Sequence, residues 1–257
     1  MNLIFGNIVD NVTAKKIIKK LDKYILKAKE EKALNAATVI SACDKLSSKL
    51  SEDDIKLLID MGVPQYKAEQ EFRLLKLMLS KEYLENRLKT ELGTSETYEY
   101  EEEYKPYGYD VKVRHKFVAL GTLFHISAGN VELLAAFSII EGLLTGNINI
   151  VKLASSDDGL SVMLLKKLID IEPLLKSFIF VFDIVSDDIK TLKKISRLSD
   201  ALVVWGSDEA IRAARTFAGI NTRIIEWGHK ISFAYVSYDQ NIDDIADKEL
   251  YSIAYNI

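Results

Sequence analysis

Hydrophobic positions recur at helical spacing through the first third of the chain. Between residues 10 and 30 this spacing predicts one amphipathic helix, with an apolar face made of Val12, Ile17, Ile18, Leu21, Ile25 and Leu26. The pattern is repeated over residues 33–50 and, after an interruption at Gly62, over residues 65–92. We therefore expect residues 1–95 to form an N-terminal helical region.

The next segment, residues 96–116, changes character and alternates tyrosine with glutamate. Tyr98, Tyr100 and Tyr104 stand among glutamates, an alternation that favours a solvated strand or hairpin. An acidic, aromatic stretch could instead attract a basic partner. We favour the strand, because nothing else in the sequence supports such a partner.

From residue 117 onward, short apolar runs alternate with amphipathic segments. The runs predicted to be strands are residues 117–127, 149–153, 178–185, 201–205, 222–226 and 231–236. The helices predicted between them are residues 131–145, 159–171, 189–198 and 210–218. Repeated strand–helix units imply an α/β fold, with a mostly parallel, Rossmann-like sheet covered by helices on both faces. We assign this domain to residues 117–257.

Composition narrows the class of protein. The chain has 257 residues, 28% of them charged, and a net charge of -4, which suits an ordinary folded protein and argues against nucleic acid as the main partner. One cysteine, Cys43, excludes an internal disulfide, and it should be a small buried hydrophobe rather than a nucleophile. The three histidines lie far apart, so no metal motif appears.

Membrane insertion is not expected from the sequence. The longest apolar run, residues 131–146, is interrupted by Glu132 and Glu141, and it falls short of the roughly 20 residues of a membrane span. The first ten residues lack the basic start and apolar run of a targeting signal. We expect a cytoplasmic protein.

Chemistry is expected at the carboxyl ends of the strands, where open α/β sheets bind ligands. Asn130 follows a predicted strand, where its amide could stabilise an oxyanion or simply cap the next helix. Lys152 ends another strand, where it could bind a ribose hydroxyl or a phosphate, or extend into solvent. Both interpretations stay open for each residue.

Two further strand ends carry candidate residues. Gly206 and Ser207 join a strand to a helix whose N-terminus could bind a pyrophosphate, or they form an ordinary turn and cap. The usual dinucleotide fingerprint is absent. Glu226 could be a general base with a raised pKa in a dry cleft, or a glutamate held in a salt bridge.

The candidate residues belong to sequence motifs that follow one another in a fixed order. The motifs ISAGN at 126–130, GNINIVK at 146–152, WGSDE at 205–209 and RIIEWGHK at 223–230 together resemble the fatty acyl-CoA reductase family of bacterial bioluminescence, the LuxC type. That family belongs to the aldehyde dehydrogenase superfamily. The resemblance covers residues 117–237 well and the helical N-terminal region only in general character.

The resemblance implies a role for each position. Asn130 matches the asparagine that holds the oxyanion, and Glu226 matches the general base. Lys152 matches the lysine at the adenine ribose. The remaining cofactor-binding positions that it implies are Ser127, Ser155, Gly206, Ser207, Trp227 and Gly228.

Two positions depart from the family pattern. NAD-dependent members usually place an acid where this chain has Ser155. An acid would repel a 2′-phosphate, whereas serine can hydrogen-bond one, so we expect NADP(H) to bind at least as readily as NAD(H). Ile211 replaces the last glycine of the pyrophosphate loop, so the diphosphate contacts are expected to differ.

The nucleophilic cysteine of the family has no counterpart after Glu226 in this sequence. Thiolate attack on a thioester is central to the chemistry that the resemblance implies. We therefore expect this chain to be the cofactor-binding portion of an NADPH-dependent acyl-CoA reductase, inactive alone.

The substrate and the partners are less well defined. The expected substrate is acyl-CoA or another acyl thioester, with no metal, no nucleic acid and no membrane span. Reduction of another activated acyl group or aldehyde stays open, as does a non-catalytic nucleotide-binding or assembly subunit. Homo-oligomers and acyl-transferring partner subunits also stay open.

Overall fold

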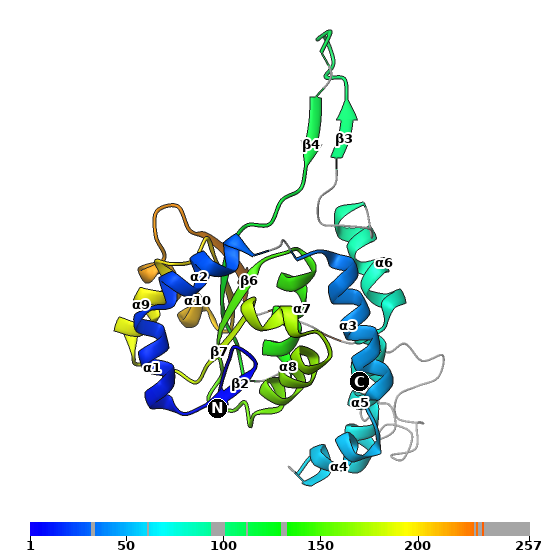
Figure 1. The fold of residues 1–257 in the computed structure, drawn as a ribbon, viewed down its shortest axis with the longest axis vertical. Coiled ribbons are helices and arrows are strands. Elements are labelled where there is room, and N and C mark those ends of the chain that lie inside the picture. Colours follow the sequence, from blue (N-terminus) through cyan, green and yellow to red (C-terminus); the bar gives the residue numbers. More distant parts are fainter. Residues whose placement is uncertain are drawn as a thin grey trace, which may run out of the picture.

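A computed structural model describes residues 1–31, 34–60, 62–93, 101–111, 113–129, 133–228, 230 and 233. Within these residues, a seven-stranded sheet has the order β2-β1-β7-β6-β5-β8-β9 (Figure 1). Its parallel strands are β5 (Thr122–Ile126), β6 (Ile148–Lys152), β7 (Ile179–Phe182), β8 (Ala201–Trp205) and β9 (Arg223–Trp227). The prediction of an α/β fold with a mostly parallel sheet is confirmed.

Helices cover both faces of this sheet, as the crossover rule requires. On one face lie α7 (Leu134–Leu144) and α8 (Leu160–Ile171), which follow β5 and β6. On the other face lie α9 (Ile189–Ser196) and α10 (Asp208–Phe217), which follow β7 and β8. The strand order reverses between β5 and β8, so their carboxyl ends flank the crevice of a doubly wound fold.

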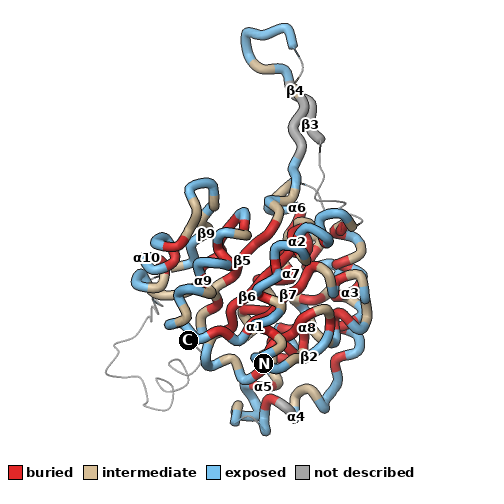
Figure 2. The backbone as a smooth tube through the Cα atoms, turned by 60° about the vertical axis from the view of Figure 1, so that its left-hand side comes forward, coloured by how far each residue is buried: buried red, intermediate tan, exposed pale blue. Residues whose placement is uncertain are grey.

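The N-terminal helices form outer layers around this core. Two of them, α1 (Asn11–Lys19) and α2 (Leu21–Glu30), lie beside α9 (Figure 1). The others are α3 (Ala36–Lys49), α4 (Glu52–Asp60), α5 (Gln65–Leu79) and α6 (Lys81–Leu92). Helix α3 packs against α7 and α8, so one continuous hydrophobic core joins the helical region to the sheet (Figure 2).

Two predicted helices are each divided in two. The expected helix 10–30 breaks at Lys20, which lies between α1 and α2 outside helical geometry. The expected helix 65–92 breaks at Ser80, whose hydroxyl accepts a hydrogen bond from the Tyr83 amide at 3.3 Å and caps α6. The apolar spacing continues through both breaks, so periodicity alone predicted single helices.

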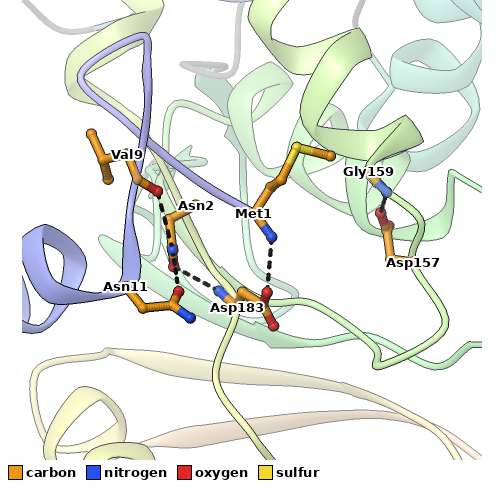
Figure 3. Close-up of polar contacts among 7 residues, drawn as sticks. All are labelled: Met1, Asn2, Val9, Asn11, Asp157, Gly159 and Asp183. Atoms are coloured by element: carbon orange, nitrogen blue, oxygen red, sulfur yellow. Dashed lines mark hydrogen bonds and ion pairs between the residues drawn. The ribbon is translucent and has the colours of Figure 1, made fainter.

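The first residues of the chain join the sheet instead of a helix. Strands β1 (Asn2–Ile4) and β2 (Asn7–Val9) form a hairpin, and β1 pairs antiparallel with β7. Asn2 is buried, and its Oδ1 accepts the Asp183 amide at 2.9 Å while its Nδ2 donates to Asn11 at 2.7 Å (Figure 3). This hairpin was not predicted from the sequence, which placed the first helix from residue 10; the N-terminal helical region of residues 1–95 and the other domain boundaries stay predictions.

A second hairpin extends away from the body of the molecule (Figures 1 and 2). Its strands are β3 (Glu101–Tyr104) and β4 (Val113–Lys116), paired antiparallel. The predicted strand or hairpin is therefore confirmed for residues 101–104, and residues 96–100 lie outside the described part. The register sets Glu101 opposite Lys116 and Glu103 opposite Arg114.

The remaining predicted strands differ in their limits. The apolar run from Phe117 enters the sheet only at Thr122, and residues 117–120 form an irregular segment before it. The strand predicted over residues 231–236 lies outside the described residues except for Phe233. Within the described ranges, every helix is too short or too polar to cross a lipid bilayer.

Candidate active site at the carboxyl edge of the sheet

Four neighbouring strands bring the candidate residues to one edge of the sheet. The register aligns Ile126 of β5 with Lys152 of β6 and with Val204 of β8, and Val204 in turn with Glu226 of β9. Lys152, the loop after β5, the Gly206–Ser207 turn and Glu226 therefore follow one another across adjacent strand ends. Residues up to 100 positions apart in the sequence are gathered where such folds bind ligands.

A cavity of about 150 Å³ opens at the ends of β5 and β6. It is lined mainly by small and acidic residues of the two loops, including Ala128, Gly129, Ala154, Ser156 and Asp157. The Ser156 hydroxyl donates to the Gly129 carbonyl at 3.0 Å, and a Cβ at position 129 would lie 1.9 Å from that hydroxyl oxygen. A side chain at position 129 would therefore displace the Ser156 hydroxyl and break its hydrogen bond between the two loops.

Ser127 joins β5 to β6 below this cavity. Its buried hydroxyl donates to the Lys152 carbonyl at 3.1 Å and accepts the Ala154 amide at 2.9 Å. Both of its hydrogen bonds are to the protein backbone. Ser127 therefore fixes the two loops relative to each other, and its contact with a cofactor stays a prediction.

Lys152 is buried at the end of β6 instead of extending into solvent. Its ammonium group donates to the Ser186 hydroxyl at 3.0 Å. Burial lowers the pKa of this ammonium group, and the nearby Asp183 carboxylate partly opposes the shift. A buried cation with a single neutral hydrogen-bond partner in the described structure retains donors for a hydroxyl or phosphate oxygen.

Gly206 and Ser207 form the turn into α10. Gly206 has φ +154°, and a Cβ there would lie 3.1 Å from the Cβ of Ala210. Ser207 caps the helix by accepting the Ala210 amide at 3.4 Å. Asp208 stands in the first helical turn, so its carboxylate competes with an external anion for the helix N-terminus.

Glu226 is held in a salt bridge. The Arg215 guanidinium on α10 donates to its two carboxylate oxygens at 2.6 and 2.9 Å. These hydrogen bonds lower the pKa of Glu226. The salt-bridge interpretation therefore describes this structure, and the raised pKa expected for a general base in a dry cleft is not what the structure shows.

Beyond Glu226, Trp227 pairs with Trp205 at the end of β8. Trp227 accepts the Gly206 amide through its carbonyl at 3.2 Å, and its ring stacks on Trp205 with centroids 4.8 Å apart. A Cβ at Gly228 would lie 3.0 Å from Cδ1 of Ile211. Ile211 is itself buried, so the residue that replaces the family glycine packs beneath this loop.

Of the remaining predicted site residues, the structure describes Ser155 but not Asn130. Ser155 is exposed in the turn after β6. Asn130 lies outside the described residues, so its role stays a prediction from the sequence. The described residues contain no cluster of histidine, cysteine or carboxylate side chains suited to a metal ion. Cys43 is fully buried, and burial raises the pKa of its thiol to about 12.

A buried polar network that the sequence did not predict lies beneath the same edge. His125 Nδ1 lies 2.7 Å from the Ser138 hydroxyl, and His125 Nε2 lies 3.0 Å from Asn149 Oδ1. The Trp205 indole N–H donates to the same hydroxyl at 3.2 Å. The only local signal was that a histidine, an asparagine and a serine occupy buried positions of predicted strands and a predicted helix.

The fold and this edge define an α/β domain with the fold of the aldehyde dehydrogenases. Glyceraldehyde-3-phosphate dehydrogenase GapN from Methanocaldococcus jannaschii, solved with NADP, superimposes with a TM-score of 0.61 at 17% identity, over 85% of this chain and 46% of its own. Betaine aldehyde dehydrogenase from Staphylococcus aureus gives 0.63 at 16% identity, over 80% and 42%. At such identities, the likeness establishes the fold.

The sequence identifies the family. The model of the acyl-CoA reductase (LuxC) family matches residues 32–255, and the chain belongs to that family. The long-chain acyl-protein thioester reductase of Photobacterium phosphoreum is 32% identical over 62% of this chain and 32% of its own length. That of Vibrio harveyi is 27% identical over 77% and 41%. The chain thus spans well under half the length of these relatives.

Proposed function

We propose that this chain is the NADP(H)-binding portion of a reductase that converts a fatty acyl thioester to an aldehyde. The observation that carries the proposal is the alignment of Lys152, Gly206 and Glu226 at adjacent strand ends, in a member of the acyl-CoA reductase family. Overall, acyl thioester, NADPH and a proton would yield aldehyde, thiol and NADP⁺. When bound, the cofactor would supply the hydride.

The edge has features that fit a dinucleotide. Gly206 leaves a space that a Cβ would partly fill, and the N-terminus of α10, which directly follows the turn, would favour an anion through its helix dipole. Lys152 would bind a ribose hydroxyl, because its buried ammonium group keeps free donors in the described structure. The Ser155 hydroxyl would donate a hydrogen bond to a 2′-phosphate oxygen without repelling it.

Acyl transfer and proton handling are assigned to different groups. A cysteine outside this chain would take the acyl group, because the Cys43 thiol is buried and stays protonated at neutral pH. Asn130 would stabilise the oxyanion. Glu226 could accept a proton only after Arg215 releases it, and in the reductive direction no water has to be activated. We therefore expect the chain alone to bind cofactor and to reduce nothing.

The test is a titration of the 257-residue chain with NADPH and with NADH at fixed salt, followed by nicotinamide fluorescence. We expect saturable binding, with NADPH equal or tighter. The variant Ser155→Glu should weaken NADPH about fourfold, the effect of two charges roughly 5 Å apart in water, and leave NADH nearly unchanged. Ser155→Ala is the neutral control. A 2′-phosphate that weakens binding severalfold in the unmodified chain would contradict the assignment.

A further inference from the structure

An apolar groove of about 270 Å³ lies on the α7 side of the sheet. The sheet contributes one aligned row to it, His125, Val203 and Ile225, from three adjacent strands. Leu123 and Trp227 extend this surface, and the irregular segment before β5 adds Phe117, Val118 and Leu120. The volume is slightly below the roughly 300–1,000 Å³ of drug-sized sites, which suits a single hydrocarbon chain.

Exposed apolar side chains gather at its mouth. Val118 is 67% exposed, and Phe117 and Trp227 are each 44% exposed. A patch of large exposed hydrophobic residues around a groove is unusual on a surface that faces only water. The surface is therefore suited to a ligand that shields carbon from solvent.

The polar groups on the floor of the groove bond to one another. Asn149 Nδ2 donates to the Asn147 carbonyl at 2.8 Å, which leaves Oδ1 to accept the Nε2–H of His125. His125 Nδ1 is then the acceptor for the Ser138 hydroxyl, which in turn accepts from Trp205. Burial lowers the pKa of His125 to about 4, so the ring is neutral and the floor offers no charge.

The one carboxylate among the lining residues is also paired. Glu141 of α7 forms a salt bridge with Arg87 of α6 at 2.5 Å at the edge of the groove. The polar groups on the floor are hydrogen-bonded to one another, and Glu141 at the edge is in a salt bridge. A polar ligand would therefore find few free partners, so the groove favours an uncharged apolar ligand over an ionic one.

The groove reaches the candidate active-site edge at Trp227. Trp227 lines it and directly follows Glu226 in β9, and the Trp227 carbonyl holds the Gly206 turn. Alternation along β9 directs Ile225 and Trp227 to the groove face, whereas Glu226 faces α10 and Arg215. A chain whose reactive end lay at the strand ends would therefore extend along the opposite face from Arg215.

We propose that this groove binds the aliphatic chain of the acyl thioester. The inference rests on the proposed function, since the relatives named as long-chain acyl-protein thioester reductases supply the chemical class of the ligand. It adds that residues of this chain, with Leu123, Val203 and Ile225 as the floor, contribute to chain-length selection. A buried methylene contributes about 0.8 kcal/mol.

The two tryptophans of the sequence, Trp205 and Trp227, make the groove observable. Trp227 lines it, and Trp205 stacks beneath Trp227. The probe is stearic acid with bromine atoms at mid-chain, which quenches indole emission on contact, titrated below its micellar concentration into the full 257-residue chain. Unbrominated stearate is the control ligand. We expect a saturable loss of most of the emission with the brominated probe only.

A groove-filling variant tests the location. Val203→Phe should weaken probe binding about tenfold, which corresponds to about 1.4 kcal/mol and to the contacts of roughly two methylenes. Val185→Phe, at an exposed position after β7, is the matched control and should bind like the parent. Far-UV circular dichroism confirms that both variants fold.

Each outcome bears on one proposal. Absence of saturable quenching, or equal quenching in Val203→Phe and the parent, overturns the acyl groove. Quenching relieved by higher protein concentration would instead indicate that a second copy covers the groove, and it overturns the proposal as well. Cofactor binding without quenching leaves the proposed function standing, whereas quenching without cofactor binding refutes the cofactor site and retains the groove.

Discussion

Ser138 and Ser161 offer a direct test of the buried network, because both are buried serines in helices of the same layer. Ser138 accepts from Trp205 and donates to His125. The hydroxyl of Ser161 has no hydrogen-bond partner among the described residues. Each alanine variant removes one hydroxyl oxygen, which is hydrogen-bonded at Ser138 and without a partner at Ser161. The difference between the two variants therefore measures the contribution of the hydrogen bonds apart from that of packing.

The expected magnitudes follow from the groups left behind. Ser138→Ala leaves a ring nitrogen of the buried His125 and the indole N–H of Trp205, a half-buried residue, without their hydrogen-bond partner. Each orphaned buried group costs about 1–3 kcal/mol, with the lower value for the indole. Alanine returns about 0.5 kcal/mol through helix propensity. We expect a net loss of about 2–3 kcal/mol, whereas Ser161→Ala should be neutral or stabilising by up to about 1 kcal/mol.

Urea unfolding measures both variants, with circular dichroism as the probe, because Ser138→Ala changes the surroundings of Trp205. The unfolding midpoint should fall for Ser138→Ala and stay level or rise for Ser161→Ala, at unchanged slope. If the two variants shift the midpoint equally, the hydrogen-bond chain contributes no more than an unpaired hydroxyl, and the reasoning about the network is refuted.

Three further outcomes are expected. Burial lowers the pKa of His125 from 6.5 to about 4, so between these pH values the unfolded chain binds more protons than the folded one. Up to about 3 kcal/mol of stability should therefore be lost as the pH falls through this range. His125→Asn should flatten this pH dependence, as measured by the unfolding midpoint in an acid titration. Gly206→Ala should lower the free energy of unfolding by about 1–2 kcal/mol, because φ +154° strains any other residue. It should also weaken NADPH binding, measured on protein that thermal denaturation shows to be folded at the assay temperature. Arg215→Ala should raise the pKa of Glu226 towards its ordinary value, because Arg215 is the main cause of its depression; carboxyl titration by NMR checks this, and an unchanged pKa would show that the salt bridge does not persist in solution.

Much of the architecture was predictable from the sequence, since alternation of apolar runs with amphipathic segments identifies strand–helix units. The order of the motifs also predicted that the candidate residues lie at adjacent strand ends. What periodicity could not show is where a helix breaks while its apolar face continues, as at Lys20 and Ser80. It also missed strand β1, because three residues carry too little pattern to be recognised without the edge of β7 beside them.

The positions of the candidate residues in the sheet were predictable from the sequence, but their electrostatic surroundings were not. Lys152 and Glu226 lie on the expected edge, yet the burial of one and the pairing of the other depend on Ser186 and Arg215, which come from different elements. The network of His125 illustrates the same limit. Its members lie on β5, β6, α7 and β8, and only the folded sheet brings them within hydrogen-bond distance.

The pairing of β1 with β7 has a consequence for synthesis on the ribosome. Asn2 bonds to Asp183, which follows it by 181 positions, so the first strand is made long before its partner emerges. During that interval, Leu3 and Ile4, both buried in the finished fold, have no sheet to join. Until β7 has been synthesised, the nascent chain therefore carries a β1–β2 hairpin whose apolar side chains lack the main sheet, and translation speed or chaperone capture becomes part of how this molecule reaches its native state.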